Sequence, residues 1–346
     1  MTEEVGAATA RALYFSAPET VEIRTEALGD LGAEELHVET VASGISPGSE
    51  LLVYRGEFPE EMAVDSTIDA LAGGFSYPLQ YGYAAVGDVT EVGEAVDETW
   101  LGRRVFAFVP HADRFRATPE AVVPVGDDVT PAEATLLPSV ETATNLVLDG
   151  RPRVGERAVV FGAGPIGLCT THVLSQFPLD RLVVVEPIPE RRDLAARFGA
   201  DRALAPDEVE SAGPFGDTPG PADGADIVYE LSGRPATLDA AIEAVGYDGR
   251  IVVGSWYGTK RAPIDLGGSF HRERISVESS QVSTVDPSLR GRWDKSRRFD
   301  VALDQLRALD TDALLAERVS FSAAADAYRR LDDRTVEAPH VVLTYQ

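Results

Sequence analysis

Residues 159–167 read VVFGAGPIG, and this short segment is the strongest indication of the fold. Gly162, Gly164 and Gly167 form the pattern G-x-G-x-x-G, directly after an apolar strand-like run and directly before a predicted helix. In this context the first glycine permits a tight turn, the second lets backbone approach a pyrophosphate, and the third lets the helix pack on the strand. The stretch therefore predicts a dinucleotide-binding turn with the pyrophosphate at the helix N-terminus. The alternative is a glycine-rich turn that holds no ligand.

The next strand-like run ends in an acidic residue, Glu186, about 20 residues further on, which completes the dinucleotide pattern. A carboxylate there accepts hydrogen bonds from the adenosine ribose and repels the 2′-phosphate of NADP, so we predict NAD as the cofactor. Arg191 and Arg192 lie one helical turn into the following predicted helix. They are placed to meet a 2′-phosphate instead, which keeps NADP as the second choice, or they balance nearby surface acids.

The chain around this turn alternates between apolar strands and helices. Predicted strands cover 157–162, 181–187, 225–233 and 249–258, and predicted helices cover 165–177, 189–200 and 235–246. Such alternation is typical of a parallel sheet covered by helices on both faces, so the fold class is α/β with a doubly wound sheet.

The ends of the chain follow a different pattern. Up to about residue 125 short β-like runs are separated by glycines, at 35–45, 84–93, 102–109 and 121–126, which predicts a barrel-like or sandwich β unit. After 283 the chain offers helices at 295–309 and 323–333 and a last strand at 340–346. The segment GISPGSELLVYRG, residues 44–56, is interpreted as a polar turn that runs into a strand-like stretch.

The composition limits the classes of partner. The chain has 346 residues, 31 Lys+Arg and 57 Asp+Glu, a net charge of −26, and its only lysines are Lys260 and Lys295. The acids are spread along the chain rather than gathered in a tail, which favours a halophilic protein from a salty cytosol over an ordinary acidic enzyme. Nucleic acid is not an expected partner, because phosphate backbones need a basic face.

Other features point to a cytoplasmic protein without membrane segments. No apolar run is long enough to cross a membrane, and the acidic N-terminus lacks the pattern of a signal peptide. The single cysteine, Cys169, allows neither an internal disulfide nor a zinc site built from several thiolates. It is interpreted as a small buried hydrophobe on the predicted helix.

Several local motifs resemble the medium-chain dehydrogenase/reductase superfamily over nearly the whole chain. The motifs are RGEFP, AAVGDVTEVG, GRRVFAF, VVFGAGPIG, ERRDLAARFGAD and DIVYELSG. The resemblance implies a β-rich, GroES-like catalytic domain at 1–140 and 284–346, with a Rossmann domain at 141–283 inserted into it. It also implies that Thr142, Pro165, Ile166, Ser232 and Gly233 contact the cofactor, with Thr142 against the nicotinamide.

The sequence departs from the zinc enzymes of that superfamily at each ligand position. Ser46 or Pro47 stands for the cysteine of the first motif, Tyr83 and Ala84 stand for the histidine and glutamate of the second, and the third position falls near Leu137. These side chains cannot form a zinc site, so no zinc is expected. The segment ISPGSELLVYRG resembles instead the zinc-lacking branch that includes bacteriochlorophyllide hydroxyethyl dehydrogenase.

Without zinc, hydrogen-bond donors or a positioned base must act on the substrate oxygen. By resemblance Ser49 matches the hydroxyl that relays the proton in zinc relatives, and the alternative is a turn hydroxyl bonded to backbone. Tyr83 would point into the same cleft and donate to the substrate, unless it fills the core. His111 is the best-placed imidazole for proton transfer, or an ordinary loop histidine. Glu141 is a candidate base, or a salt-bridge partner at the hinge.

Two further segments suggest partners. SLRGRWDKSRRF, residues 288–299, gathers Arg290, Arg292, Lys295, Arg297 and Arg298 in an acidic chain. We hypothesise that this patch binds an anionic substrate group beside Trp293; the alternative is charge balance against nearby acids or a subunit. By resemblance, residues 275–283 form the outer strand of the Rossmann sheet and pair across a two-fold axis, so a homodimer or homotetramer is expected.

Together these features predict a zinc-independent, NAD(P)-dependent oxidoreductase that transfers hydride between nicotinamide and an alcohol or carbonyl carbon of a small molecule. One alternative is a quinone or enoyl reductase that acts on a carbon–carbon double bond. The other is a dinucleotide-binding protein without catalysis, since a fold alone does not establish chemistry.

Overall fold

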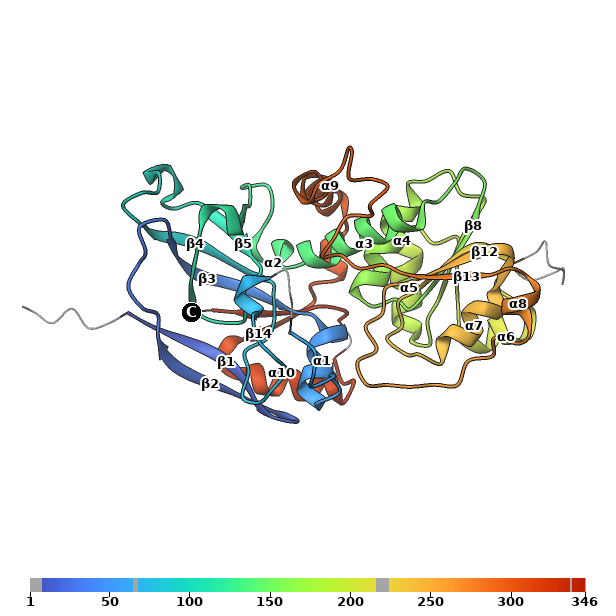
Figure 1. Ribbon diagram of the computed structural model, residues 1–346, viewed down its shortest axis with the longest axis horizontal. Helices are drawn as coiled ribbons and strands as arrows, with labels where there is room; N and C mark the ends of the chain where they lie inside the picture. The colour runs from blue at the N-terminus through green and yellow to red at the C-terminus, as the bar shows by residue number, and fades with distance from the viewer. Residues whose placement is uncertain (1–7, 65–67, 216–223, 337, 346) are drawn as a thin grey trace, which may run out of the picture. The chain divides into compact units, whose positions relative to one another are not determined.

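The protein divides into two compact units. The computed structural model describes residues 8–64, 68–215, 224–336 and 338–345. The units are Met1–Pro138 with Leu315–Gln346, and Ser139–Leu314. In Figure 1 the first unit takes its elements from the start of the chain, which runs from blue to green, and from its red end, and the second unit takes its elements from the stretch between them. The expected fold class, a doubly wound α/β unit inserted into a β-rich unit, is confirmed.

The first unit is built on a seven-stranded sheet and a separate hairpin. The path through the sheet is β14-β15-β3-β4-β5-β7, β6 pairs with β3, and β1 pairs only with β2 among the described strands. The strands are β1 (Thr9–Ala17), β2 (Thr20–Ala27), β3 (Leu36–Ile45), β4 (Ala85–Val92), β5 (Arg104–Ala107), β6 (Arg114–Ala117), β7 (Val122–Pro124), β14 (Glu317–Ser320) and β15 (Val341–Thr344). Buried aliphatic side chains of β3, β4 and β5 form one core cluster of this unit.

The second unit contains a parallel sheet in the order β10-β9-β8-β11-β12-β13. Its strands are β8 (Arg157–Phe161), β9 (Arg181–Val185), β10 (Arg202–Leu204), β11 (Ala225–Glu230), β12 (Val245–Val253) and β13 (Ser276–Ser279). Its helices are α3 (Leu137–Gly150), which starts two residues before the unit boundary, α4 (Pro165–Ser175), α5 (Pro189–Arg197), α6 (Pro206–Ala212), α7 (Thr237–Ala244), α8 (Ser269–Arg272) and α9 (Lys295–Ala308). After their first residues β8 and β9 are wholly buried, as strands covered on both faces are.

One prediction about the first unit is wrong. Residues 44–56 are not a turn leading into a strand, because most of them form the helix α1 (Pro47–Arg55). Pro47 fits the first helical position, where its missing N–H is not needed. The helix ends at Gly56, whose φ of 74° is left-handed and whose N–H bonds back to the carbonyls of Leu52 and Val53. The other helices of this unit are α2 (Pro131–Ala134) and α10 (Ala324–Asp332).

The return of the chain to the β-rich unit also differs from the expected domain boundary. Residues 284–314 were expected with the β-rich domain, but they belong to the second unit. The physical reason lies in α9, where Arg298 is fully buried and bonds to Glu141 and Asn145 of α3. This contact joins the two helices within one unit.

Candidate functional site

The glycine turn between β8 and α4 has the geometry that a dinucleotide needs. A Cβ on Gly167 would lie 1.9 Å from the carbonyl oxygen of Gly162, so only glycine allows the helix to start so close to the strand. Gly162 has a φ of 100°, and a Cβ there would lie 2.7 Å from the oxygen of Leu231. A Cβ on Gly164, in contrast, would meet no atom within 4 Å. The open space at Gly164, beside the N-terminus of α4, fits a pyrophosphate. Pro165 and Ile166 follow as the first two residues of α4.

We use the name cofactor cradle for the glycine turn, Glu186 and the Ser232–Gly233 loop. Glu186 forms the second side of this cradle. Its side chain is 5% exposed, its Oε2 accepts the N–H of Ala163 at 2.7 Å, and its Oε1 accepts the N–H of Ile188 at 3.1 Å. Each carboxylate oxygen keeps a further lone pair for a ribose hydroxyl. The carboxylate is therefore fixed at the C-terminal end of β9, beside the glycine turn, where the sequence places a ribose-binding acid.

The two arginines of α5 differ in their surroundings. Arg192 Nη1 donates to the backbone oxygens of Glu186 at 2.7 Å and Pro187 at 2.8 Å, so this guanidinium already braces the loop. Arg191 is half-buried in the first turn of α5. A 2′-phosphate would therefore have to compete with backbone acceptors for Arg192.

The third side of the cradle is the loop after β11. It contains Ser232 and Gly233, two of the residues expected to contact the cofactor. The N–H and the hydroxyl of Ser232 both donate to Glu230, which is fully buried, and the phenol of Tyr257 donates to the same carboxylate at 2.5 Å. The backbone of Ser232 lies against Gly162. Burial raises the pKa of the Tyr257 phenol, and the hydrogen bond to Glu230 adds to the effect, so this phenol stays a donor. Sequence reasoning missed Glu230 and Tyr257, because their contact spans 27 residues.

Ser49 and Tyr83 meet in the first unit. The Oγ of Ser49, in the first turn of α1, lies 2.6 Å from the phenolic oxygen of Tyr83, and either atom can be the donor. Both side chains are partly exposed. Tyr83 packs edge-on against Tyr81 with ring centroids 6.0 Å apart, so its ring is supported while its hydroxyl reaches the serine. The two residues proposed to replace zinc thus form one hydroxyl pair.

His111 lies in a closed network rather than at an open surface. It is fully buried, its Nδ1 lies 2.7 Å from Ser43 Oγ, and its Nε2 lies 3.0 Å from Glu50 Oε2. Glu50 also accepts the N–H of Ser46 and the phenol of Tyr328. With both ring nitrogens bonded to protein and no exposure, His111 does not reach a substrate directly. This corrects its place as a direct proton-transfer group.

The network continues beyond His111. The hydroxyl of Ser43 lies 2.8 Å from the phenolic oxygen of Tyr345. Burial raises the pKa values of the Tyr328 and Tyr345 phenols, and Glu50 adds to the rise at Tyr328. Sequence reasoning missed Ser43, Glu50, Tyr328 and Tyr345. Their partners lie 61 to 302 positions away in the chain, and no local pattern marks them.

From the sequence, Glu141 was either a candidate base or a salt-bridge partner. The structure shows it as a salt-bridge partner. Its side chain is buried, and Arg298 Nη2 donates to its Oε1 at 2.6 Å. Desolvation raises the pKa of Glu141, and the positive charge of Arg298 partly offsets the rise. Its oxygen is thus held by a guanidinium instead of being aimed at a proton donor. Thr142, the next residue of α3, is half-buried.

The same ion pair corrects the predicted cationic patch. Arg298 is fully buried and gives its N–H groups to Glu141, to Asn145 and to the carbonyls of Val282 and Thr284, so it is not available to a substrate. Arg297 lies over the ring of Trp293, with its guanidinium carbon 4.2 Å from the ring centroid. Exposed cations of the patch remain at Arg290, Arg292, Lys295 and Arg297.

The donor atoms at the zinc positions of the superfamily do not fit zinc. Ser46 and Pro47 start α1, Tyr83 offers a phenol bonded to Ser49, and Ala84 and Leu137 are buried apolar side chains. Neutral hydroxyls and hydrocarbon are not zinc ligands. Within the part of the chain that the structure describes, no three His, Cys, Asp or Glu side chains come together as a possible metal site. Among the same residues, no helix is both long and apolar enough to cross a membrane.

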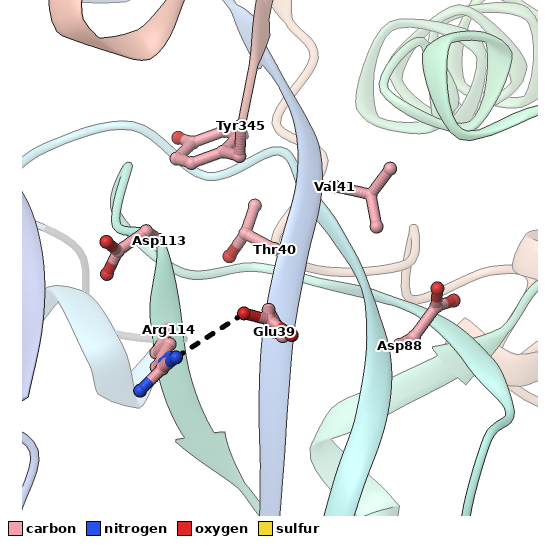
Figure 2. A pocket seen from close by; sticks show the side chains of 7 residues that line it. All are labelled: Glu39, Thr40, Val41, Asp88, Asp113, Arg114 and Tyr345. Carbon is pink, nitrogen blue, oxygen red and sulfur yellow. Dashed lines mark hydrogen bonds and ion pairs between the residues drawn. The ribbon is translucent and has the colours of Figure 1, made fainter. Parts of the chain in front are cut away.

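A separate pocket of the first unit does not include Ser49 or Tyr83. Figure 2 shows its lining residues, which are Glu39, Thr40, Val41, Asp88, Asp113, Arg114 and Tyr345. Each of its carboxylates is paired with an arginine, namely Glu39 with Arg114, Asp88 with Arg104 and Asp113 with Arg11. The pocket therefore presents neutralised acids rather than a free anionic site.

Comparison with known proteins supports a dehydrogenase fold with a nicotinamide cofactor, but the matched family is described as zinc-binding. Residues 165–299 match the family model described as zinc-binding dehydrogenase. D-guloside 3-dehydrogenase of Escherichia coli K12 is 24% identical over 296 residues, which cover 82% of each chain. D-xylulose reductase of Saccharomyces cerevisiae is 26% identical over 292 residues, covering 72% of this chain and 77% of the relative.

The fold similarity extends over nearly the whole chain. An alcohol dehydrogenase from E. coli CFT073, solved in complex with NADH, matches with a TM-score of 0.76 and 19% identity, and the match covers 97% of this chain and 99% of that one. The relatives that cover most of the chain are named dehydrogenases and reductases. The chain is therefore an oxidoreductase, and it is similar to medium-chain dehydrogenases and reductases over most of its length.

Proposed function

We propose that this protein is a zinc-independent, NAD(P)-dependent oxidoreductase of the zinc-lacking branch, which interconverts a small alcohol and its carbonyl compound. The observation that carries the proposal is the Ser49–Tyr83 hydroxyl pair, at 2.6 Å, where zinc enzymes of the superfamily have a proton-relay hydroxyl and a zinc ligand. The same sequence positions offer no zinc ligands. The zinc-lacking assignment goes against the description of the matched family, and it rests on these side chains.

The cradle formed by the glycine turn, Glu186 and the Ser232–Gly233 loop supports a nicotinamide dinucleotide as the cofactor. When bound, the dinucleotide supplies the carbon that accepts or gives the hydride. Glu186 supports NAD over NADP, because its carboxylate is fixed by the N–H groups of Ala163 and Ile188 and would repel a 2′-phosphate. Arg192 is already bonded to backbone oxygens, which weakens the case for NADP.

The hydroxyl pair supplies the proton chemistry. In alcohol oxidation the substrate hydroxyl donates its proton to one member of the pair, Tyr83 or Ser49. That member passes its own proton along the hydrogen bond to the other, which releases a proton to solvent, because both side chains are partly exposed. In carbonyl reduction the pair donates to the substrate oxygen and stabilises the negative charge that develops there. Two hydroxyls are needed because one bonds to the substrate oxygen while the other exchanges the transferred proton with it.

The substrate class that we propose is a small secondary alcohol or polyol. The relatives that support it carry the names D-guloside 3-dehydrogenase and D-xylulose reductase. The exposed cations Arg290, Arg292, Lys295 and Arg297 justify including carboxylated and phosphorylated alcohols in a substrate panel.

We also propose a homodimer or homotetramer in which β13 pairs with its counterpart. This strand is at the edge of the six-stranded sheet, and Val277 in it is 45% exposed. An open edge with an apolar side chain is a surface that pairing would cover. Light scattering in molar KCl should give at least twice the mass of the chain, and a monomer mass would refute this part.

The test of the proposed function is a turnover panel in molar KCl. Secondary alcohols, polyols and their ketones are compared with enones and quinones, each with NAD(H) and NADP(H), before and after treatment with a chelator. We expect turnover of alcohols and ketones, preferentially with NAD(H), that survives chelation. Turnover confined to enones or quinones would show that the alternative reaction, reduction of a carbon–carbon double bond, is the true one.

A further inference from the structure

Glu50 is a buried carboxylate that the proposed chemistry does not use. It is fully buried, and the structure gives it three donors: the N–H of Ser46 at 2.6 Å, the ring Nε2 of His111 at 3.0 Å, and the phenol of Tyr328. A charge without solvent costs free energy unless hydrogen bonds replace the water. Such an arrangement is maintained only where the surrounding protein fixes every partner.

One side of this carboxylate is bonded to the turn that carries Ser49. Glu50 Oε1 accepts the N–H of Ser46, and the carbonyl of Ser46 accepts the N–H groups of Ser49 at 3.2 Å and Glu50 at 3.0 Å. Ser46 is thus bonded to the Glu50 side chain through its N–H and to the Glu50 backbone through its carbonyl. Loss of the carboxylate contact would release the N–H of Ser46, the residue whose carbonyl bonds the first turn of α1 that carries the hydroxyl of Ser49.

The other side leads to Tyr83 through His111. His111 Nε2 lies 3.0 Å from Glu50 Oε2, and an ionised carboxylate takes this bond from the tautomer with the proton on Nε2. The same imidazole packs against Gly82, where a Cβ would lie 2.5 Å from ring atoms Cδ2 and Nε2. Gly82 immediately precedes Tyr83 and has a φ of 108°. His111 therefore contacts the backbone directly before Tyr83. It also bonds to the carboxylate of Glu50, which fixes the turn that carries Ser49.

We propose that Glu50 and His111 are positioning residues that set the distance between Ser49 Oγ and the Tyr83 hydroxyl, with Tyr328 fixing the carboxylate. None of the three needs to touch the substrate. The inference rests on the proposed function, because it gives the pair its role in turnover. The inference adds to the proposed function the buried groups that would hold the hydroxyl pair rigid, as a metal centre does in zinc enzymes.

The kinetic test uses Glu50→Gln, His111→Gln and Tyr328→Phe, each in the wild-type and in the Ser49→Ala background. A displaced reacting group costs on the order of 10²-fold, so kcat should fall by about that factor in the wild-type background, while KM changes little. In the Ser49→Ala background the same substitutions should have much smaller effects, because the residue through which they act is gone. Equal losses in both backgrounds would overturn the proposal.

A matched control is Tyr14→Phe, which removes another phenol-to-carboxylate bond of the first unit, from Tyr14 to Glu26 in the β1–β2 hairpin. It should leave kcat at the wild-type value, whereas Tyr328→Phe should lower it. A loss at Tyr14→Phe as large as that at Tyr328→Phe would show a general effect of lost stability, and would overturn a specific positioning role.

A second readout does not depend on turnover. Hydrogen exchange of a peptide covering residues 45–52 reports the N–H of Ser46 and the first turn of α1. Glu50→Gln and Tyr328→Phe should speed exchange there, with exchange in β11 and β12 of the second unit unchanged. Unchanged exchange at 45–52 would overturn the positioning role. If Ser49→Ala alone leaves turnover intact, the proposed function fails, and the exchange experiment still decides whether Glu50 fixes the turn.

Discussion

The buried ion pair between Arg298 and Glu141 should be the most sensitive single contact of the second unit. Arg298 donates at 2.6 Å to Glu141 and at 2.6 Å to Asn145, and also to two backbone carbonyls. In Arg298→Met the helix α9 keeps a side chain of similar length, but the carboxylate of Glu141 remains buried without its counter-charge. Removing one partner of such a pair costs about 3–5 kcal/mol of unfolding free energy, and we expect a loss in that range.

The loss should depend on pH in a defined direction. Desolvation already raises the pKa of Glu141 above its ordinary value of 4.5, and Arg298 opposes that rise. A carboxyl with a raised folded-state pKa binds its proton more tightly in the folded state. Its contribution to stability is therefore full below the unfolded pKa and declines as pH rises through the folded pKa. Without Arg298 the folded pKa rises further, so the deficit of the variant should be smallest near pH 4.5 and should grow toward neutral pH.

Urea unfolding in molar KCl, followed by tryptophan fluorescence, measures this effect, because Trp256 and Trp293 lie in the second unit. The control is Arg307→Ala on the same helix, where the arginine pairs with Asp304 at the surface and the expected change is about 0.5 kcal/mol or less. Adding Glu141→Gln to Arg298→Met should recover much of the loss, since the buried charge is then gone. A deficit below about 1 kcal/mol at pH 7.5, or one that grows toward acid pH, would mean that Arg298 does not compensate a buried Glu141 charge.

Three further results are expected. The melting temperature should rise from low to molar KCl, because salt screens the repulsion behind the net charge of −26, and a flat or falling trend would refute the halophilic prediction. Glu186→Ser should shift calorimetric binding from NAD toward NADP; tighter NADP binding by the unaltered protein would mean that Arg191 and Arg192 decide the preference. Burial raises the pKa of the Cys169 thiol to about 12, so a thiol reagent at pH 8 should modify it only after unfolding, and rapid labelling of the native protein would contradict its buried position.

The sequence predicted well the features that depend on residues close together in the chain. In the turn from β8 to α4, Gly167 must be glycine because of Gly162, five residues earlier, and the carboxylate of Glu186 follows at the end of the next strand. The alternation of strands and helices predicted the parallel sheet. The resemblance to the medium-chain superfamily, rather than local chemistry, placed residues 275–283 at the sheet edge where β13 lies.

The features that sequence missed depend on distant contacts. In α1, Pro47 and Gly48 suggest a turn, and Leu51 to Tyr54 are all buried, so no helical period distinguishes them from a strand. What stabilises the helix start is Glu50, whose partners His111 and Tyr328 are 61 and 278 residues away. The predicted cationic patch wrongly included Arg298 for the same reason. Nothing near Arg298 in the sequence shows that Glu141, 157 residues earlier, pairs with it.

In the proposed mechanism a hydroxyl pair, not a metal, activates the substrate oxygen. Zinc content by elemental analysis and kcat for the best alcohol substrate, measured on the same samples of wild type, Ser49→Ala and Tyr83→Phe, decide between the two. We expect no stoichiometric zinc, unchanged wild-type turnover after chelation, and a loss of about a hundredfold to a thousandfold in each variant. One zinc per chain, with activity that disappears on chelation and returns with added zinc, would contradict it, as would wild-type rates in both variants.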